Sequence, residues 1–146
     1  MDTHEILFTD IRRWKYRLDE QVRVRTDWYP PVTLRLSHFR LDPDSVLTLE
    51  TGFMWDGPSG PTWDTPNWML PSAVHDAFYR LLTEDLIPDR AKCRKHADDL
   101  MYAMLRERGM NNFRASYSWV AVRLSPWAVI TTCQATDPCW LWRAVS

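Results

Sequence analysis

The spacing of apolar residues changes once along this chain, and that change constrains the fold more than any other feature. Up to about residue 51 apolar and polar residues alternate, most clearly at residues 22–25, 32–36 and 46–50. Period-two alternation is typical of strands that bury one face. Pro30 and Pro31 separate the first two segments, and an Asp-Pro-Asp sequence around Pro43 separates the next two, as turns would.

From about residue 71 apolar residues recur at helical spacing. The apolar face of a first helix is made by Val74, Phe78, Leu81 and Leu82. Pro71 suits the first turn of this helix, where a missing N–H costs nothing. Pro88 marks the start of a second helix, and Gly109 is a suitable stop. A third helix is predicted from about residue 112 to residue 125, before Pro126.

Strands followed by helices predict an α+β fold, with N-terminal antiparallel strands and a C-terminal bundle of about three helices. We predict one domain with a strand-rich part (1–51), a Gly/Pro loop (52–70), a helical part (71–131) and an irregular tail (132–146). The short link between the first two helices favours an antiparallel pair. A loop as long as 52–70 is often functional. Alternatively, this segment contains a short strand around Phe53.

The charge, the apolar runs and the cysteines limit the partners and the location expected for this protein. The formal net charge is −1, so no general attraction to nucleic acid or anionic lipid is expected, and no nucleic-acid partner is predicted. The N-terminus does not resemble a signal peptide, and no apolar run reaches the roughly 20 residues of a transmembrane segment. Three cysteines without C-x-x-C spacing (Cys93, Cys133 and Cys139) fit a reducing compartment.

Nine tryptophans are many for 146 residues. Large aromatic side chains usually anchor a core or an interface. Core packing is one interpretation. The alternative is a Trp-rich surface that meets a partner, to which Trp127, Trp140 and Trp142 near the C-terminus would contribute.

His75, Tyr79, Asp98 and Tyr102 form the candidate catalytic site. His75 and Tyr79 are four residues apart and share one helix face, as do Asp98 and Tyr102 on the next helix. In an antiparallel pair Asp98 would reach His75 or Tyr79. A carboxylate on one imidazole nitrogen leaves the other nitrogen free to act as a base. The alternative is a hydrogen bond that only joins the two helices.

A metal site is a further hypothesis. Asp56, Asp76 and the backbone carbonyls of Gly57 and Gly60 would offer oxygen ligands, which suit calcium or magnesium. Alternatively, the loop is a turn-rich connection whose polar side chains cap their own backbone. A zinc site of His75, Asp98 and His96 matches no standard spacing. His96 and Asp99 point away from Asp98 on the helix, and we predict that both are solvated.

Three ordered motifs resemble a family of phages and prophages catalogued as domain of unknown function 1353. They are Gly52-Phe53-x-x-Asp56-Gly57-x-Ser59-x-Pro61, His75-Asp76-x-x-Tyr79-Arg80 and Ala97-Asp98-x-Leu100. The likeness runs from about residue 52 to the end of the third helix, roughly half of the chain. It implies a phage or prophage origin and brings no established activity.

The sequence His75-Asp76-x-x-Tyr79 with a later Asp98 also resembles the helix pair of secreted phospholipases of the A-two type. This resemblance implies that His75 activates water and that Asp98 orients His75. It further implies that Asp76 binds calcium together with loop carbonyls, and that Tyr79 and Tyr102 hold Asp98. The chain departs from those enzymes: no cysteine adjoins His75, the glycine loop differs, and strands precede the helices.

Two functions are therefore expected for a phage-encoded protein of the host cytoplasm. The first is a metal-assisted hydrolase that acts on an ester-type bond with His75 and Asp98, using calcium or another divalent metal ion. The second is a non-catalytic virion component or binder of a host factor, whose tryptophans contact a host or phage protein.

Overall fold

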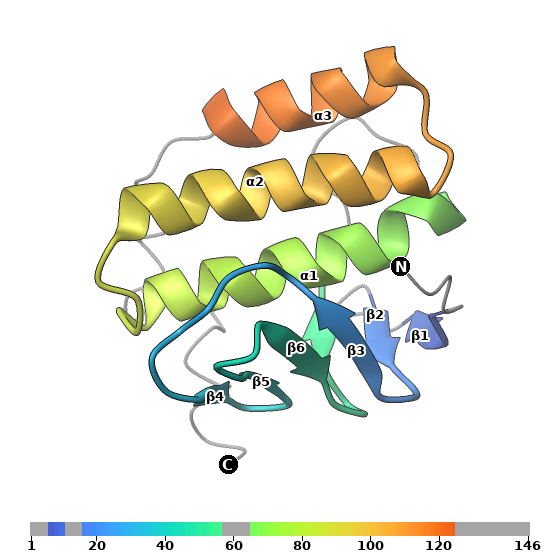
Figure 1. Ribbon diagram of the computed structural model, residues 1–146. Helices are drawn as coiled ribbons and strands as arrows, with labels where there is room; N and C mark the ends of the chain where they lie inside the picture. Colours follow the sequence, from blue (N-terminus) through green and yellow to red (C-terminus); the bar gives the residue numbers. More distant parts are fainter. Residues whose placement is uncertain (1–5, 11–15, 57–64, 125–146) are drawn as a thin grey trace, which may run out of the picture.

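The computed structural model describes residues 6–10, 16–56 and 65–124. Strands come first and helices second, so the predicted α+β fold is confirmed (Figure 1). The described strands form two antiparallel sheets. In one, the order is β1 (Phe8–Asp10), β2 (Tyr16–Leu18) and β7 (Met54–Trp55). In the other it is β3 (Val22–Arg25), β6 (Val46–Leu49), β5 (Phe39–Leu41) and β4 (Leu34–Leu36).

The alternation in the sequence places the strands correctly where it is longest. In β3 both valines are buried and both arginines are exposed, as predicted. β4 begins at Leu34, two residues later than the alternation at 32–36 predicts, and Val32 before it is exposed. β5 is too short to show a period of its own. It forms because His38, at φ +64°, helps to turn the chain back so that Phe39 pairs with Leu36.

The segment 52–70 contains more regular structure than a loop. Met54 and Trp55 form β7 and pair with β2, so the alternative of a short strand next to Phe53 is confirmed. Helix α1 (Pro66–Thr83) begins five residues before Pro71, so the prediction that Pro71 lies in the first turn is wrong. Pro66 occupies the start instead, and Pro71 is accommodated inside the helix. The extra turn buries Trp68, Met69 and Leu70.

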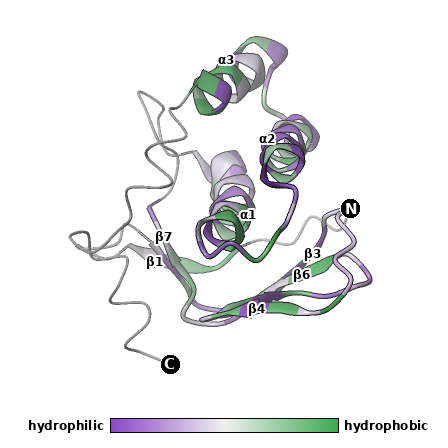
Figure 2. Cartoon of the chain, turned by 90° about the vertical axis from the view of Figure 1, so that its left-hand side faces the viewer, coloured by the Kyte–Doolittle hydropathy of each residue, from purple (hydrophilic) through white to green (hydrophobic). Residues whose placement is uncertain are grey.

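The three helices stack in order away from the sheets. α2 (Arg90–Glu107) begins after Asp89, whose carboxylate caps the helix by accepting a hydrogen bond from the Lys92 N–H. α3 (Asn112–Leu124) follows the turn at Gly109, which has φ +87°. Figures 1 and 2 both show α1 against the strands, α2 beside α1, and α3 farthest from the sheets.

Apolar side chains from both sheets pack against α1 and α2 in one core. Among its largest buried side chains are Phe39, Phe53, Trp55 and Phe78. The Trp55 indole N–H donates to Ser72 Oγ at 3.1 Å, which ties β7 to α1. Core packing is confirmed for Trp55 and Trp68, whereas Trp127, Trp140 and Trp142 lie outside the described residues. Cys93 is a buried free thiol.

Truncation of Phe78 should destabilise the fold strongly, because its ring is 0% exposed at the junction of α1 with the strands. We expect Phe78→Ala to lower the free energy of unfolding in urea by about 3–5 kcal/mol. Phe113→Ala is the matched control, since that ring is 85% exposed, and its effect should stay within about 0.5 kcal/mol. Equal effects of the two substitutions would contradict this placement of the core.

Candidate functional site

The carboxylate of Asp98 lies at the centre of the candidate site and is 0% exposed. His75 Nε2 lies 2.7 Å from its Oδ1, and the Tyr79 hydroxyl donates to the same oxygen at 2.8 Å. The Arg123 guanidinium donates to Oδ2 at 3.1 Å. One buried carboxylate therefore joins α1, α2 and α3.

Helical spacing and helix direction explain how these groups meet. His75 and Tyr79 lie one turn apart, with their ring centroids 4.2 Å apart. Along α1 the next contact after His75–Asp98 is that between Tyr79 and Arg94, one turn earlier on α2. Contacts that advance along one helix and recede along the other show that the pair is antiparallel, as predicted. The predicted contact of Asp98 with His75 and Tyr79 is confirmed.

The charge state of Asp98 follows from its partners. Burial alone would raise the pKa of Asp98, but the hydrogen bonds from His75, Tyr79 and Arg123 outweigh it and hold the pKa below its usual value. Burial raises the pKa of Tyr79, and the neighbouring Asp98 carboxylate raises it further against the effect of Arg94. Tyr79 is therefore a neutral phenol that donates to an ionised carboxylate.

An ionised Asp98 determines which nitrogen of His75 carries the proton. A carboxylate only accepts hydrogen bonds, so Nε2 carries the hydrogen and Nδ1 carries the lone pair of the neutral ring. Among the described residues, Nδ1 has no hydrogen-bond partner. The side chain is 15% exposed, whereas Asp98 is fully covered. This is the arrangement of a base whose orienting carboxylate is shielded from water.

Two arginines complete the network, and the sequence motifs did not point to them. Arg94 donates from Nε to the Tyr79 hydroxyl at 3.3 Å. Its Nη2 donates to the carbonyls of Val122 and Arg123 at 3.2 and 3.3 Å, at the end of α3. Arg94 precedes Asp98 by one helical turn, which is a weak signal of proximity. Arg123 is distant in sequence and carries no such signal.

Tyr102 does not join the network as the resemblance implied. Its hydroxyl lies 3.5 Å from Asn112 Oδ1 at the start of α3. Asp98 instead receives its third hydrogen bond from Arg123. Tyr102 follows Asp98 by one turn of α2, but α3 lies across this side of the helix and its residues are the nearer partners.

The two carboxylates proposed as metal ligands, Asp76 and Asp56, lie in different surroundings. Asp76 forms an ion pair with Arg80, with 2.6 Å between the charged groups. Arg80 also donates to the Met54 carbonyl, and its guanidinium carbon lies 4.7 Å from the centre of the Phe53 ring. Asp56 is exposed, and Gly57 and Gly60 lie outside the described residues. Within the described ranges no three His, Cys, Asp or Glu side chains are placed to hold a metal ion.

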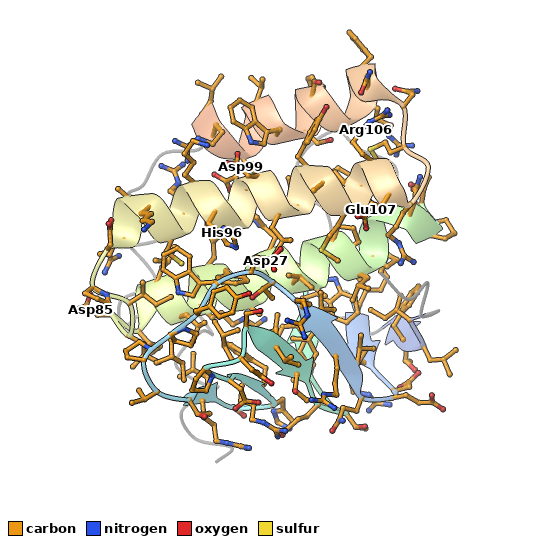
Figure 3. The ribbon with its side chains drawn as sticks, in the orientation of Figure 1. Asp27, Asp85, His96, Asp99, Arg106 and Glu107 are labelled. Carbon is orange, nitrogen blue, oxygen red and sulfur yellow. The ribbon has the colours of Figure 1, made fainter. Side chains whose placement is uncertain are left out.

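The prediction that His96 and Asp99 are solvated is wrong for His96. Its Nε2 lies 2.6 Å from the Thr26 carbonyl, and its ring packs against Trp28 and Phe78. The reason is that the segment after β3 crosses α2 here, which no local pattern reveals. Figure 3 shows Asp99 between α2 and α3. Asp99 is partly exposed and accepts hydrogen bonds from Lys95 and from the Trp119 indole on α3.

In comparisons with protein-family models, curated proteins and solved structures, nothing matches this chain. The resemblances to the phage family and to the phospholipases therefore stay predictions. In the part of the chain that the structure describes, no helix combines the length and apolarity needed to cross a membrane.

Acid should destabilise the protein in part through Asp98. A carboxyl whose pKa is lowered by folding stabilises the folded state above its unfolded pKa of about 3.9, and this contribution is lost as the pH falls through the lower folded pKa. We expect the free energy of unfolding to fall between about pH 5 and pH 2, and to fall less steeply in Asp98→Asn. Urea denaturation at several pH values measures both slopes.

At pH 7 Asp98→Asn should cost about 3–5 kcal/mol, because Arg123 and His75 lose a charged partner inside the fold. Asp99→Asn is the matched control next to it on the same helix. Since Asp99 is partly exposed, we expect a cost below about 1 kcal/mol. If the free energy of unfolding depends on pH identically in the wild type and in Asp98→Asn, the lowered pKa of Asp98 is contradicted.

Proposed function

We propose that His75 and Asp98 form the catalytic pair of a hydrolase that acts on an ester-type bond. One observation carries the proposal: the buried Asp98 carboxylate holds His75 Nε2 at 2.7 Å, while Nδ1 has no partner in the described part of the chain. A histidine used only to join helices would not need a side chain that is partly exposed. Here the ring is 15% exposed.

In this proposal His75 acts first as a base and then as an acid. Nδ1 takes a proton from a water molecule, and the resulting hydroxide attacks the ester carbonyl carbon. The tetrahedral intermediate expels the alcohol, which takes the proton from Nδ1. Asp98 stays ionised and stabilises the imidazolium formed between the two steps. Tyr79 on one oxygen and Arg123 on the other keep the carboxylate from turning away.

Metal assistance is a separate part of the proposal. Asp76 and Asp56, with the carbonyls of Gly57 and Gly60, are the proposed ligands of calcium or another divalent ion. The ion would supply polarisation of the ester carbonyl. Its binding requires Asp76 to exchange Arg80 for the ion, because the two side chains form an ion pair. The described residues do not form a ready metal site, so no step above depends on the ion.

The second candidate is a non-catalytic phage protein that binds a host or phage protein, and α3 favours it. Four large apolar side chains on this helix are exposed: Phe113, Tyr117, Val120 and Leu124. Their spacings of four, three and four residues place them on one face. In this alternative the Asp98 network only locks the helices, and the exposed face of α3 is the contact surface. A phage origin and a place in the host cytoplasm are part of both candidates.

Replacement of His75 separates the two candidates. We expect His75→Asn to lower the rate of ester hydrolysis at least about 100-fold, because the base is lost. The assay uses a panel of chromogenic esters, with calcium, magnesium or zinc added to chelator-stripped protein. His38→Asn is the matched control, since His38 lies in the β4–β5 turn at φ +64°, which Asn tolerates. Thermal unfolding monitors the fold.

A wild-type protein that hydrolyses none of these esters, combined with a His75→Asn variant that is only less stable, would favour the binding protein. Equal activity of the wild type and His75→Asn would also contradict the catalytic role.

The metal hypothesis is tested by calorimetric titration of chelator-stripped protein with calcium, magnesium and zinc. We expect saturable binding that is lost in Asp76→Asn, because a neutral amide is a poor ligand for these ions. Asp85→Asn is the matched control: Asp85 also pairs with an arginine, Arg90, and sits at φ +56° in the α1–α2 link. No binding of any of the three ions, or equal binding by both variants, would contradict metal assistance.

A further inference from the structure

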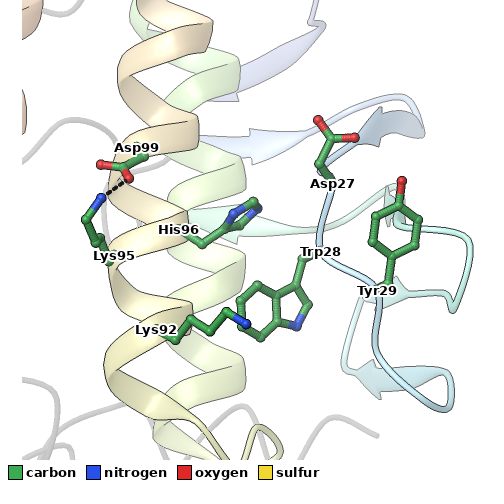
Figure 4. A pocket seen from close by; sticks show the side chains of 7 residues that line it. All are labelled: Asp27, Trp28, Tyr29, Lys92, Lys95, His96 and Asp99. Carbon is green, nitrogen blue, oxygen red and sulfur yellow. Dashed lines mark hydrogen bonds and ion pairs between the residues drawn. The ribbon is translucent and has the colours of Figure 1, made fainter.

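A groove of about 440 Å³ lies between α2 and the segment that follows β3 (Figure 4). Asp27, Trp28 and Tyr29 line it from the segment, and Lys92 and His96 line it from α2. None of these residues belongs to the network of Asp98. Sites for small molecules commonly occupy about 300–1,000 Å³, so the groove is large enough for one.

His96 lines this groove and carries a hydrogen-bond acceptor. Its Nε2 lies 2.6 Å from the Thr26 carbonyl, which can only accept, so Nε2 carries the hydrogen. The lone pair of the neutral ring is then on Nδ1, which has no hydrogen-bond partner among the described residues. Thr26 itself is held firmly, since both its N–H and its hydroxyl donate to the Ser45 carbonyl at 2.9 Å. The acceptor is thus fixed in place.

Trp28 forms the apolar wall of the groove, and Tyr29 lies at its edge. The Trp28 ring lies 5.3 Å from the His96 ring and packs on the edge of the core. Tyr29 is 63% exposed, which is high for a tyrosine beside a groove. In Figure 4 the Trp28 ring lies between the segment and α2, whereas the Tyr29 ring lies on the other side of the segment. The Trp28 ring favours a planar aromatic ligand, because stacking adds to the burial of apolar area.

Four charged side chains line the groove, and two of them pair with each other. In the described part of the chain the Lys92 ammonium has no ion-pair partner. Lys95, one turn of α2 further on, is already paired with Asp99 at 2.5 Å. Asp27 is exposed and points away from Lys92 in Figure 4. The groove therefore offers the Lys92 cation, the exposed Asp27 carboxylate and a neutral acceptor, beside the Lys95–Asp99 ion pair that also lines it.

We propose that this groove binds a nucleoside monophosphate. Its phosphate pairs with Lys92, its base lies against Trp28, and amine or hydroxyl donors of the base and sugar reach His96 Nδ1 and Asp27. A small inorganic anion would leave the aromatic wall and both acceptors unused. This inference does not depend on the proposed hydrolase, because the two sites share no residue.

The test is an NMR titration of the ¹⁵N-labelled full chain with AMP, CMP, GMP and UMP, beside adenosine and inorganic phosphate as separate probes. We expect saturable shifts at the groove residues with a Kd of about 1 mM or tighter for at least one of the four. Adenosine and phosphate alone should bind more weakly than AMP, because each meets only one part of the groove.

Lys92→Gln should weaken binding at least about fivefold, since the phosphate loses its ion pair. Lys95→Gln is the matched control, because it removes the same charge from the same helix at a lysine that is already paired, and it should change Kd less than about twofold. His96→Gln should weaken binding severalfold, because the ring acceptor is lost. Gln at position 96 keeps a donor for the Thr26 carbonyl, so the fold is preserved.

Three results would overturn the proposal. They are the absence of saturable shifts with all four nucleotides, equal weakening by Lys92→Gln and Lys95→Gln, and binding of inorganic phosphate as tight as that of the nucleotides. The second would indicate a diffuse charge effect, and the third a general anion site.

Discussion

A carboxylate inside the protein has to be matched by donors, and this requirement organises the helical half of the molecule. Asp98 is completely buried and accepts hydrogen bonds from α1 and α3. An unmatched charge at this position would be strongly unfavourable, so the three helices are restrained together. For α3 this restraint is important, because among its described side chains only Ala115 and Ser118 are buried. Arg94 adds to it by donating to the last carbonyls of α3.

Helix α2 contacts α1, α3 and the segment after β3, because successive residues of a helix point about 100° apart. Asp98 faces the network with α1, Asp99 bonds to Trp119 on α3, and His96 bonds to the segment after β3. The proposed catalytic pair and the proposed nucleotide groove thus occupy different sides of α2. Each depends on a histidine whose Nε2 is engaged by an oxygen of the protein. The oxygen that engages His75 belongs to a charged carboxylate, which suits a base. The oxygen that engages His96 belongs to a neutral carbonyl, which suits a hydrogen-bond acceptor.

Much of the fold could be predicted from local patterns. Val22 and Val24 are buried because alternation and burial coincide in a strand with one covered face. His75 and Tyr79 share a face because they are four residues apart, and the short α1–α2 link makes the helices antiparallel, which brings Asp98 to them. The start of α1 could not be predicted in the same way. Two prolines five residues apart both suit a first turn, and only the packing of Trp68, Met69 and Leu70 favours the earlier one.

By itself, the sequence determined the order of strands and helices and the identity of the His75–Tyr79–Asp98 cluster. These depend on periodicity and on contacts between neighbouring helices, which act over short distances along the chain. Only the tertiary structure decided that Arg123 rather than Tyr102 completes the shell of Asp98, and that His96 meets Thr26 across 70 positions of sequence. Such contacts depend on how α3 and the segment after β3 lie over α2. That placement is set by the packing of the whole core, and no local spacing encodes it.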